Sequence, residues 1–248
     1  MAAPGLQHHL HVGLEHTARY AVLPSDPAHC AVIAAHLDDA TQVARNREFE
    51  SWRGTLDGEP VLVTSTGVGG PSTALAIEEL RAVGVDTFVR VGTSLTFQPS
   101  VRTGDLALAT AAIRDEGTTR QYVPVEFPAV ADPDVVAALR AAATERDAPH
   151  HVGVVHTKDS FYGEVEPDRM PMARHLRERL DMWAALGVLC SEMEMATVLT
   201  VARTLGARAG GLVLMWGDDV DPTAPPSLAD LHGTAVGAVA RLIADRRA

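Results

Sequence analysis

The chain has 248 residues and a formal net charge of −11, because 32 acidic residues outnumber 21 basic ones. This balance argues against non-specific nucleic-acid binding, which needs a basic surface, but it allows a small anionic ligand held by a few arginines. Hydrophobic residues make up 46% of the chain and charged residues 21%, so a packed globular core is expected. Because aromatic residues make up only 4%, this core must consist mainly of aliphatic side chains.

The amino-terminal segment shows no basic stretch followed by an apolar one, so no signal peptide is expected. No apolar run approaches the roughly 20 residues that a membrane helix needs. Cys30 and Cys190 are the only cysteines and have apolar neighbours, which favours two buried free thiols over a disulfide. We therefore expect a cytoplasmic protein that binds neither a membrane nor a nucleic acid.

Apolar, strand-like runs alternate with helical patterns along the chain. Strands are predicted at 19–23, 60–66, 87–93, 105–113, 151–157 and 210–216. Helices are predicted at 28–37, 71–83, 134–146, 170–186, 192–205 and 228–247, with a Pro-rich loop at 218–227. This alternation implies a largely parallel central sheet with helices on both faces. We therefore predict a three-layer α/β/α sandwich formed by one domain over residues 1–248, with ligands at the carboxyl ends of its strands.

The first predicted strand ends in the turn LPSDPAHC (23–30). Asp26 suits a helix N-cap and Pro27 suits the first helical turn, so this stretch is ordinary for the start of a helix. A strand that ends at a helix start also leaves free N–H groups that attract anions. A second turn, STGVGGPST (65–73), is rich in glycine but lacks the lysine of a P-loop, and it indicates only a close approach of the backbone.

Arg90 lies inside an apolar run that is expected to be a buried strand. A buried arginine is costly unless it meets an anion or a carboxylate, so both a structural salt bridge and an anion-binding role are open. Farther along, Ser191 and Glu194 have the spacing of a capping box ahead of an apolar helix. Glu192 and Glu194 can face the same way only on an extended segment, where they could hold sugar hydroxyls. Spacing alone favours the cap.

Together these segments resemble the nucleoside phosphorylase-I family, and most closely its uridine phosphorylases. The matching motifs are HVGL (11–14), DP (26–27), REFE (47–50), STGVGGPSTALAIEEL (65–80), TFVRVGT (87–93), EFPAVAD (126–132), DSFYG (159–163) and EME (192–194). The resemblance implies the phosphorylase α/β/α fold, with a mixed central sheet. It also implies a pentosyltransferase, which cleaves the glycosidic bond of a nucleoside with inorganic phosphate as co-substrate and without a resident cofactor.

The resemblance assigns roles to individual residues. Phosphate ligands are expected at the first turn, at Arg90 and Thr93, and at Arg47 of a neighbouring subunit, and Arg90 is also expected to be catalytic. The ribose is expected to meet Met193 and Glu194, together with His11 from the neighbour. Because sites are shared in this way, the family implies homodimers assembled into hexamers. The remaining expected roles are base contacts at Phe161, Glu164 and Arg169, and an interface monovalent cation such as K⁺ at Glu48, Val68 and Ser72.

The phosphate turn departs from the family pattern. Ser25 stands where uridine phosphorylases commonly have a glycine, and His29 stands where they have an arginine. Serine tolerates fewer backbone conformations than glycine, and histidine offers at most a titrating charge. We therefore expect weaker phosphate binding, and a hydrolytic nucleosidase and a catalytically silent nucleoside-binding homologue stay open as alternatives.

The expected base pocket also departs from the family pattern. Leu95 and Phe97 add bulk after Thr93, and Glu164 stands where the family reads uracil with a glutamine. Because an ionised glutamate only accepts hydrogen bonds, it would prefer a base edge with donors, such as an amino group, which leaves a purine or amino-bearing base open. Asp218 lies near the position of the general acid in purine-cleaving relatives, and could equally be a solvated loop residue.

Overall fold

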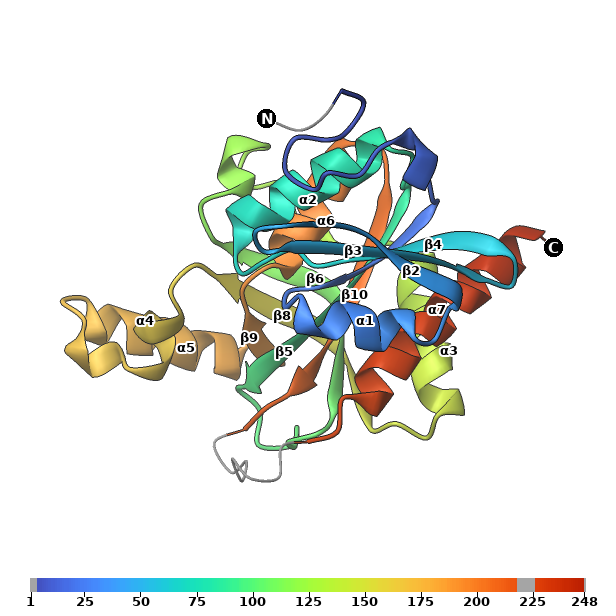
Figure 1. Ribbon diagram of the computed structural model, residues 1–248. Helices are drawn as coiled ribbons and strands as arrows, with labels where there is room; N and C mark the ends of the chain where they lie inside the picture. The colour runs from blue at the N-terminus through green and yellow to red at the C-terminus, as the bar shows by residue number, and fades with distance from the viewer. Residues whose placement is uncertain (1–3, 218–225, 248) are drawn as a thin grey trace.

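A ten-stranded sheet with helices on both faces makes up the body of the protein in a computed structural model that describes residues 4–217 and 226–247 (Figure 1). Helices α2 (Gly70–Ala82) and α6 (Met195–Thr204) pack on one face of the sheet. Helices α1 (Ala28–Ala34), α3 (Pro133–Glu145) and α7 (Ala229–Arg247) pack on the other. Each face has its own apolar core of mainly Val, Leu, Ile and Ala, which confirms the predicted three-layer sandwich.

The sheet is mixed, as the family resemblance implied. Its strands follow the order β10-β6-β8-β9-β5-β1-β4-β3-β2, and β10 also pairs with β5. The central strand β5 runs parallel to both β1 and β10, whereas β10 is antiparallel to β6. The bounds are β1 Tyr20–Pro24, β2 Asp38–Asn46, β3 Phe49–Leu56, β4 Glu59–Thr64, β5 Thr87–Thr96, β6 Leu106–Asp115, β7 Ala129–Val130, β8 His150–Lys158, β9 Cys190–Glu192 and β10 Arg208–Met215.

The predicted order of strands and helices is confirmed in most places, with two corrections. Strands β2 and β3 form an antiparallel hairpin at the sheet edge that was not predicted, because β2 has no buried residue and so no apolar alternation. The helix predicted from residue 192 begins only at Met195, because Cys190–Glu192 form strand β9 between β5 and β8. Helices α4 (Phe161–Val165) and α5 (Ala173–Ala185) form an arm that projects from the sandwich (Figure 1).

Both cysteines are buried free thiols, as expected. Burial raises the pKa of the Cys30 thiol and of the Cys190 thiol to about 12. Within the described residues, no helix is long and apolar enough to cross a membrane.

Arg90 owes its place in the central strand to a glycine on the neighbouring strand. Gly211 of β10 lies opposite Arg90 of β5 in the sheet register. A Cβ atom at Gly211 would stand 2.8 Å from the Cβ atom of Arg90 and 2.7 Å from the Cε atom of Met195. Such distances are too short for packed carbon atoms, so a side chain at this position must displace Arg90 or Met195.

We expect Gly211→Ala to lower the free energy of unfolding by about 1–3 kcal/mol through overpacking. The measurement is urea unfolding of the wild type and the variant. Gly117→Ala is the matched control, because its new Cβ would meet only a carboxylate oxygen of Asp159, at 3.6 Å. Equal stability of the two variants would contradict the prediction.

Candidate active site

A cavity of about 510 Å³ opens where strands β1, β5, β8 and β9 end. The parallel strands β1 and β5 bring their carboxyl ends to one edge of the sheet, which is where ligands bind in open α/β folds, and β9 pairs with that end of β5 in the antiparallel direction. The cavity wall combines residues predicted for the phosphate, the ribose, the base and the interface cation, from segments far apart in the sequence. Those residues are Ser25, His29, Val68, Arg90, Thr93, Phe161, Met193 and Glu194.

The guanidinium of Arg90 organises the floor of this cavity. Its side chain is 2% exposed, and its Nε donates a hydrogen bond of 2.9 Å to Glu192. The same guanidinium forms an ion pair with Glu194 and donates a hydrogen bond of 2.9 Å to Oγ of Ser25. The two interpretations of Arg90 are therefore compatible, because the residue forms buried salt bridges and also lines the cavity.

The expected capping box is wrong. Ser191 lies in strand β9, and no side-chain cap from Glu194 holds the start of α6. Instead, the Glu192 carboxylate accepts hydrogen bonds of 2.8 Å from the backbone N–H groups of Glu194 and Met195. The extended segment lets both glutamates point to Arg90, as the alternative interpretation required.

Glu194 is held from a second side by the glycine-rich loop. The backbone N–H of Gly69 donates a hydrogen bond of 2.6 Å to its carboxylate, which explains the close backbone approach expected for this loop. Burial raises the pKa of the Glu194 carboxyl, the Arg90 guanidinium opposes this, and the nearby Glu192 carboxylate adds to it. The position of the carboxyl is thus fixed by two elements before any ligand binds.

At the first turn, the Asp26 side chain accepts a hydrogen bond of 2.9 Å from the backbone N–H of Ala28, as its helix-start role predicts. His29 lines the cavity from α1, and its ring lies 5.3 Å from the ring of His232 on α7 in an edge-on arrangement. His232 is buried, and its Nε2 atom has no hydrogen-bond partner in the described part of the chain. Burial, and to a smaller extent the nearby His29 and His36, lower the pKa of His232 to about 4.

Phe161 begins α4 and lines the cavity with a half-exposed ring. Glu164 does not line this cavity but a neighbouring one of about 190 Å³. Lys158 and Ser191 are the groups that reach the main cavity from this side. The Nζ atom of Lys158 lies 2.9 Å from Oε1 of Glu164 and 2.8 Å from Oγ of Ser191.

Behind Ser191 the polar network continues into the protein. His156 contacts Oγ of Ser191 through Nδ1 at 3.0 Å and Asp115 through Nε2 at 3.0 Å. Burial would raise the pKa of Asp115, but the hydrogen bonds from His156 and Arg179 outweigh it and hold this pKa below its usual value. Because an ionised carboxylate only accepts hydrogen bonds, Nε2 of His156 carries a proton.

The structure does not bring every predicted site residue to this cavity. Arg47, at the tip of the β2–β3 hairpin, and His11, before β1, both have positive φ angles and lie outside the cavity wall. Arg169 pairs with Glu166 at 2.8 Å and lies over the Tyr162 ring.

The predicted cation residues do gather, at the turn before α2. The side chains of Glu48 and Ser72 both lie close to Gly67, and Oγ of Ser72 contacts the Val68 carbonyl at 3.3 Å. The candidate general acid, Asp218, lies outside the described residues.

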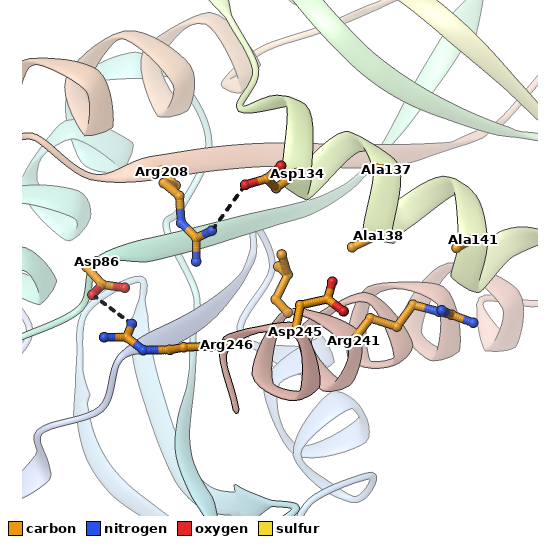
Figure 2. Close-up of a pocket in the computed structure, with 10 residues that line it drawn as sticks. Asp86, Asp134, Ala137, Ala138, Ala141, Arg208, Arg241, Asp245 and Arg246 are labelled. Carbon is orange, nitrogen blue, oxygen red and sulfur yellow. Dashed lines mark ion pairs between the residues drawn. The ribbon is translucent and has the colours of Figure 1, made fainter. Parts of the chain in front are cut away.

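A second large cavity, of about 600 Å³, lies between α3 and α7 (Figure 2). Its charged groups pair with one another, Arg208 with Asp134 at 3.8 Å and Arg246 with Asp86 at 3.7 Å. Asp86 precedes β5 and Arg208 begins β10, so this cavity lies at the amino ends of the strands. It is therefore a poorer candidate for the active site than the cavity around Arg90.

Comparison with known proteins identifies the family. The model of the phosphorylase superfamily matches residues 19–245. The chain belongs to this superfamily. It is 44% identical to the uridine phosphorylase of Treponema pallidum (strain Nichols), over 84% of this chain and 81% of that protein. It is also 44% identical to the uridine phosphorylase of Escherichia coli (strain K12), over 78% of each chain.

A guanosine phosphorylase of Halorubrum lacusprofundi is 39% identical, over 86% of this chain and 83% of that protein. These matches confirm the resemblance inferred from the motifs, including its closeness to the uridine phosphorylases. They leave the base open, because relatives of similar coverage are named for a pyrimidine and for a purine nucleoside.

Sequence reasoning missed Glu192 as the second carboxylate on Arg90, and Lys158, Ser191 and His156 as one polar cluster. A signal for Glu192 was present, since two glutamates at alternate positions share a face on an extended segment. The cluster could not be read from spacing, because His156 and Lys158 come from β8 and Ser191 comes from β9.

His232 makes stability depend on pH. In the unfolded chain its pKa has the ordinary value of 6.5, whereas burial lowers the folded value to about 4. The contribution of neutral His232 to folding stability is therefore fully present above pH 6.5. It is lost as the pH falls toward 4, because the unfolded state takes up the proton first.

Between pH 7 and pH 4.5 we expect the His232→Leu variant to lose about 2 kcal/mol less folding stability than the wild type loses. Urea unfolding at each pH tests this, with the exposed His175→Leu as control, and parallel losses in all three proteins would refute it.

Proposed function

We propose that the protein is a nucleoside phosphorylase of the uridine phosphorylase type, which cleaves a nucleoside reversibly to the free base and ribose 1-phosphate. The observation that carries this proposal is the cavity around Arg90. It places Ser25, Thr93 and Arg90 beside Met193 and Glu194 in a chain of the phosphorylase superfamily. One nucleoside and one phosphate are the substrates, and no resident cofactor takes part.

The contacts around Arg90 support a division of the cavity. Phosphate would occupy the end formed by the first turn, Arg90 and Thr93, below C1′ of the sugar. Glu194, held by Gly69 and Arg90, would accept hydrogen bonds from the ribose hydroxyls beside Met193. Such a site acts by positioning the phosphate and by stabilising charge, since the sugar becomes positive while the base departs.

The charge balance at the phosphate end supports a site shared between subunits. With both carboxylates ionised, Arg90, Glu192 and Glu194 together carry one net negative charge, which disfavours a phosphate dianion. Further cations are therefore needed, and His29 supplies one candidate in the same chain. We propose that Arg47 of a neighbouring copy supplies another and that its His11 contacts the ribose.

We extend this proposal to the assembly and its setting. One domain over residues 1–248 would form dimers, and dimers would form a hexamer. A monovalent cation such as K⁺ would sit at the dimer interface near Glu48, Val68 and Ser72, which gather around Gly67 in the single chain. The expected location is the cytoplasm.

The two rival functions make different predictions about products. The substitutions at Ser25 and His29 favour a hydrolytic nucleosidase, because they weaken the phosphate turn. A nucleoside-binding homologue without turnover would retain the pocket and lose the reaction. We favour phosphorolysis because Arg90 and Thr93 line one end of the cavity as the expected phosphate ligands, for which a hydrolase has little need.

A nucleoside panel with and without phosphate tests the reaction. We expect uridine to yield ribose 1-phosphate and uracil only when phosphate is present. The assay separates sugar products for uridine, cytidine, guanosine and adenosine. Free ribose released at the same rate without phosphate would identify a nucleosidase, and binding by calorimetry without any turnover would identify the silent homologue.

The phosphate turn offers a second prediction. We expect His29→Ala to raise KM for phosphate about tenfold, because a hydrogen-bond donor to phosphate is lost, and His29→Arg to lower it, because a guanidinium brings a permanent charge and more donors. Initial rates at varied phosphate and saturating nucleoside measure this effect. The exposed His36→Ala, just after the other end of α1, is the matched control. An unchanged KM in both His29 variants would remove His29 from the phosphate site.

A further inference from the structure

Lys158 is the only lysine in a sequence whose other basic residues are all arginines. It is the last residue of β8, and its side chain is 8% exposed. An ammonium group is a compact point charge with three N–H donors, whereas a guanidinium is a planar fork, so the two are not interchangeable at a confined site. The one lysine of this arginine-rich chain is therefore a compact charge in a buried position at the end of β8.

The ammonium group of Lys158 lies between two cavities. It lines the substrate cavity together with Phe161 and Ser191, and it lines the smaller cavity behind together with Glu164. Within the described residues it donates to Glu164 at 2.9 Å and to Ser191 at 2.8 Å. Two of its three N–H groups are thereby used, and the third is left for a ligand in the substrate cavity.

Glu164 contacts Lys158 and Ser191 through its two carboxylate oxygens. Its Oε1 atom accepts from Lys158, and its Oε2 atom accepts from the hydroxyl of Ser191. Both carboxylate oxygens are therefore engaged, and the group that borders the substrate cavity is the ammonium group. This arrangement differs from the expectation that an ionised glutamate itself contacts the base.

The position of Lys158 along the cavity is set by its neighbours. Ser191 directly precedes Glu192, the buried partner of Arg90, so Lys158 contacts the start of the segment that ends at Glu194. Phe161, three residues after Lys158, lines the same cavity. Neither Lys158 nor Phe161 contacts the first turn through a described hydrogen bond or ion pair. Both side chains are therefore available to the part of the nucleoside that lies away from the phosphate.

We propose that Lys158 donates a hydrogen bond to a carbonyl oxygen of the base and stabilises the negative charge that forms there as the glycosidic bond breaks. This inference rests on the proposed phosphorolysis and names the group that acts on the leaving base. Glu164 and Ser191 are positioning residues, because they hold the ammonium group at the cavity wall.

The step balances without any further reactant. A phosphate oxygen forms a bond to C1′ while the bond from C1′ to the base nitrogen breaks, and its electron pair moves onto the base. Hydrogen phosphate gives up its proton, which reaches the base by way of solvent, so the products are the neutral base and the ribose 1-phosphate dianion. Lys158 remains an ammonium ion throughout and only donates a hydrogen bond.

This role predicts a class of substrate. Uracil and guanine both carry a carbonyl oxygen that can accept from an ammonium group, at O4 and O6. Cytosine and adenine carry an amino group at the corresponding position, which places a donor against a donor. We therefore expect keto bases to be preferred over amino bases, whether the ring is a pyrimidine or a purine.

Leaving-group chemistry distinguishes this role from a purely structural ion pair. We compare uridine with 5-fluorouridine, whose base departs as a more stable anion. In Lys158→Met we expect kcat/KM for uridine phosphorolysis to fall about 100-fold, as for loss of one transition-state donor. The loss for 5-fluorouridine should be about tenfold smaller, because less stabilisation is needed. Equal losses for the two substrates would overturn the proposal.

A double variant and a control variant distinguish a loss of folding from a loss of catalysis. Lys158→Met leaves Glu164 buried without its cation, so the double variant Lys158→Met with Glu164→Gln removes both charges and should show the same substrate-dependent loss. Arg174→Met on the exposed face of α5 is the matched control, with no loss for either substrate. If the wild type phosphorolyses no nucleoside, the proposed function fails. If it does and the double variant loses activity equally on both substrates, only the role of Lys158 fails.

The single lysine also allows a direct measurement of contact. Protein made with lysine labelled with ¹⁵N at Nζ has one side-chain lysine signal. We expect uracil to shift this signal in the folded oligomer and phosphate alone to leave it in place. A signal that uracil does not move, in protein shown by calorimetry to bind uracil, would place Lys158 away from the base and refute the proposal.

Discussion

The ion cluster of Arg90, Glu192 and Glu194 is the constraint on which the rest of the site depends. Burying a guanidinium is unfavourable unless its donors are matched, and here the matching carboxylates come from one short extended segment. That segment must therefore be strand β9 and not the first turn of α6, and Gly211 must stay small to leave room for the arginine. The Glu192 carboxylate in turn accepts from the first N–H groups at the start of α6. Removing either carboxylate would thus disturb a helix, a strand and the cavity floor together.

Much of the fold could be predicted from the sequence, because buried strands and amphipathic helices carry strong periodic signals. The β2–β3 hairpin was missed because β2 lies at the sheet edge without a buried residue. Strand β9 was missed because three residues are too few for a pattern, and Ser191 with Glu194 imitates a capping box. The family motifs pointed to Arg90, Thr93, Met193, Glu194 and Phe161, which the structure brings into one cavity. The contacts of Lys158 were beyond prediction, since they depend on three elements that meet only in the fold.

The two histidines at the first turn show how one substitution changes its surroundings. Where the related phosphorylases commonly have an arginine, His29 packs its ring against His232 of the last helix. His232 stays neutral because its pKa is lowered to about 4, mainly by burial, so it adds no positive charge that would attract an anion. A guanidinium at position 29 would reach farther into the cavity than an imidazole. The turn therefore keeps its position in the fold. Its side-chain contribution to anion binding depends on the imidazole ring of His29.

The charges along the cavity match the charges that phosphorolysis creates. Phosphate brings negative charge to the end formed by Ser25, His29 and Thr93, where the proposed Arg47 of a neighbouring copy would add a cation. In the proposed reaction the sugar becomes positive in the transition state, and the carboxylates of Glu192 and Glu194 line the same cavity. The departing base becomes negative, and Lys158 is the cation proposed to act on it. Because Arg90, Lys158 and the two glutamates are buried and held by fixed partners, they need no rearrangement as charge develops, and this is the condition under which electrostatic catalysis is most effective.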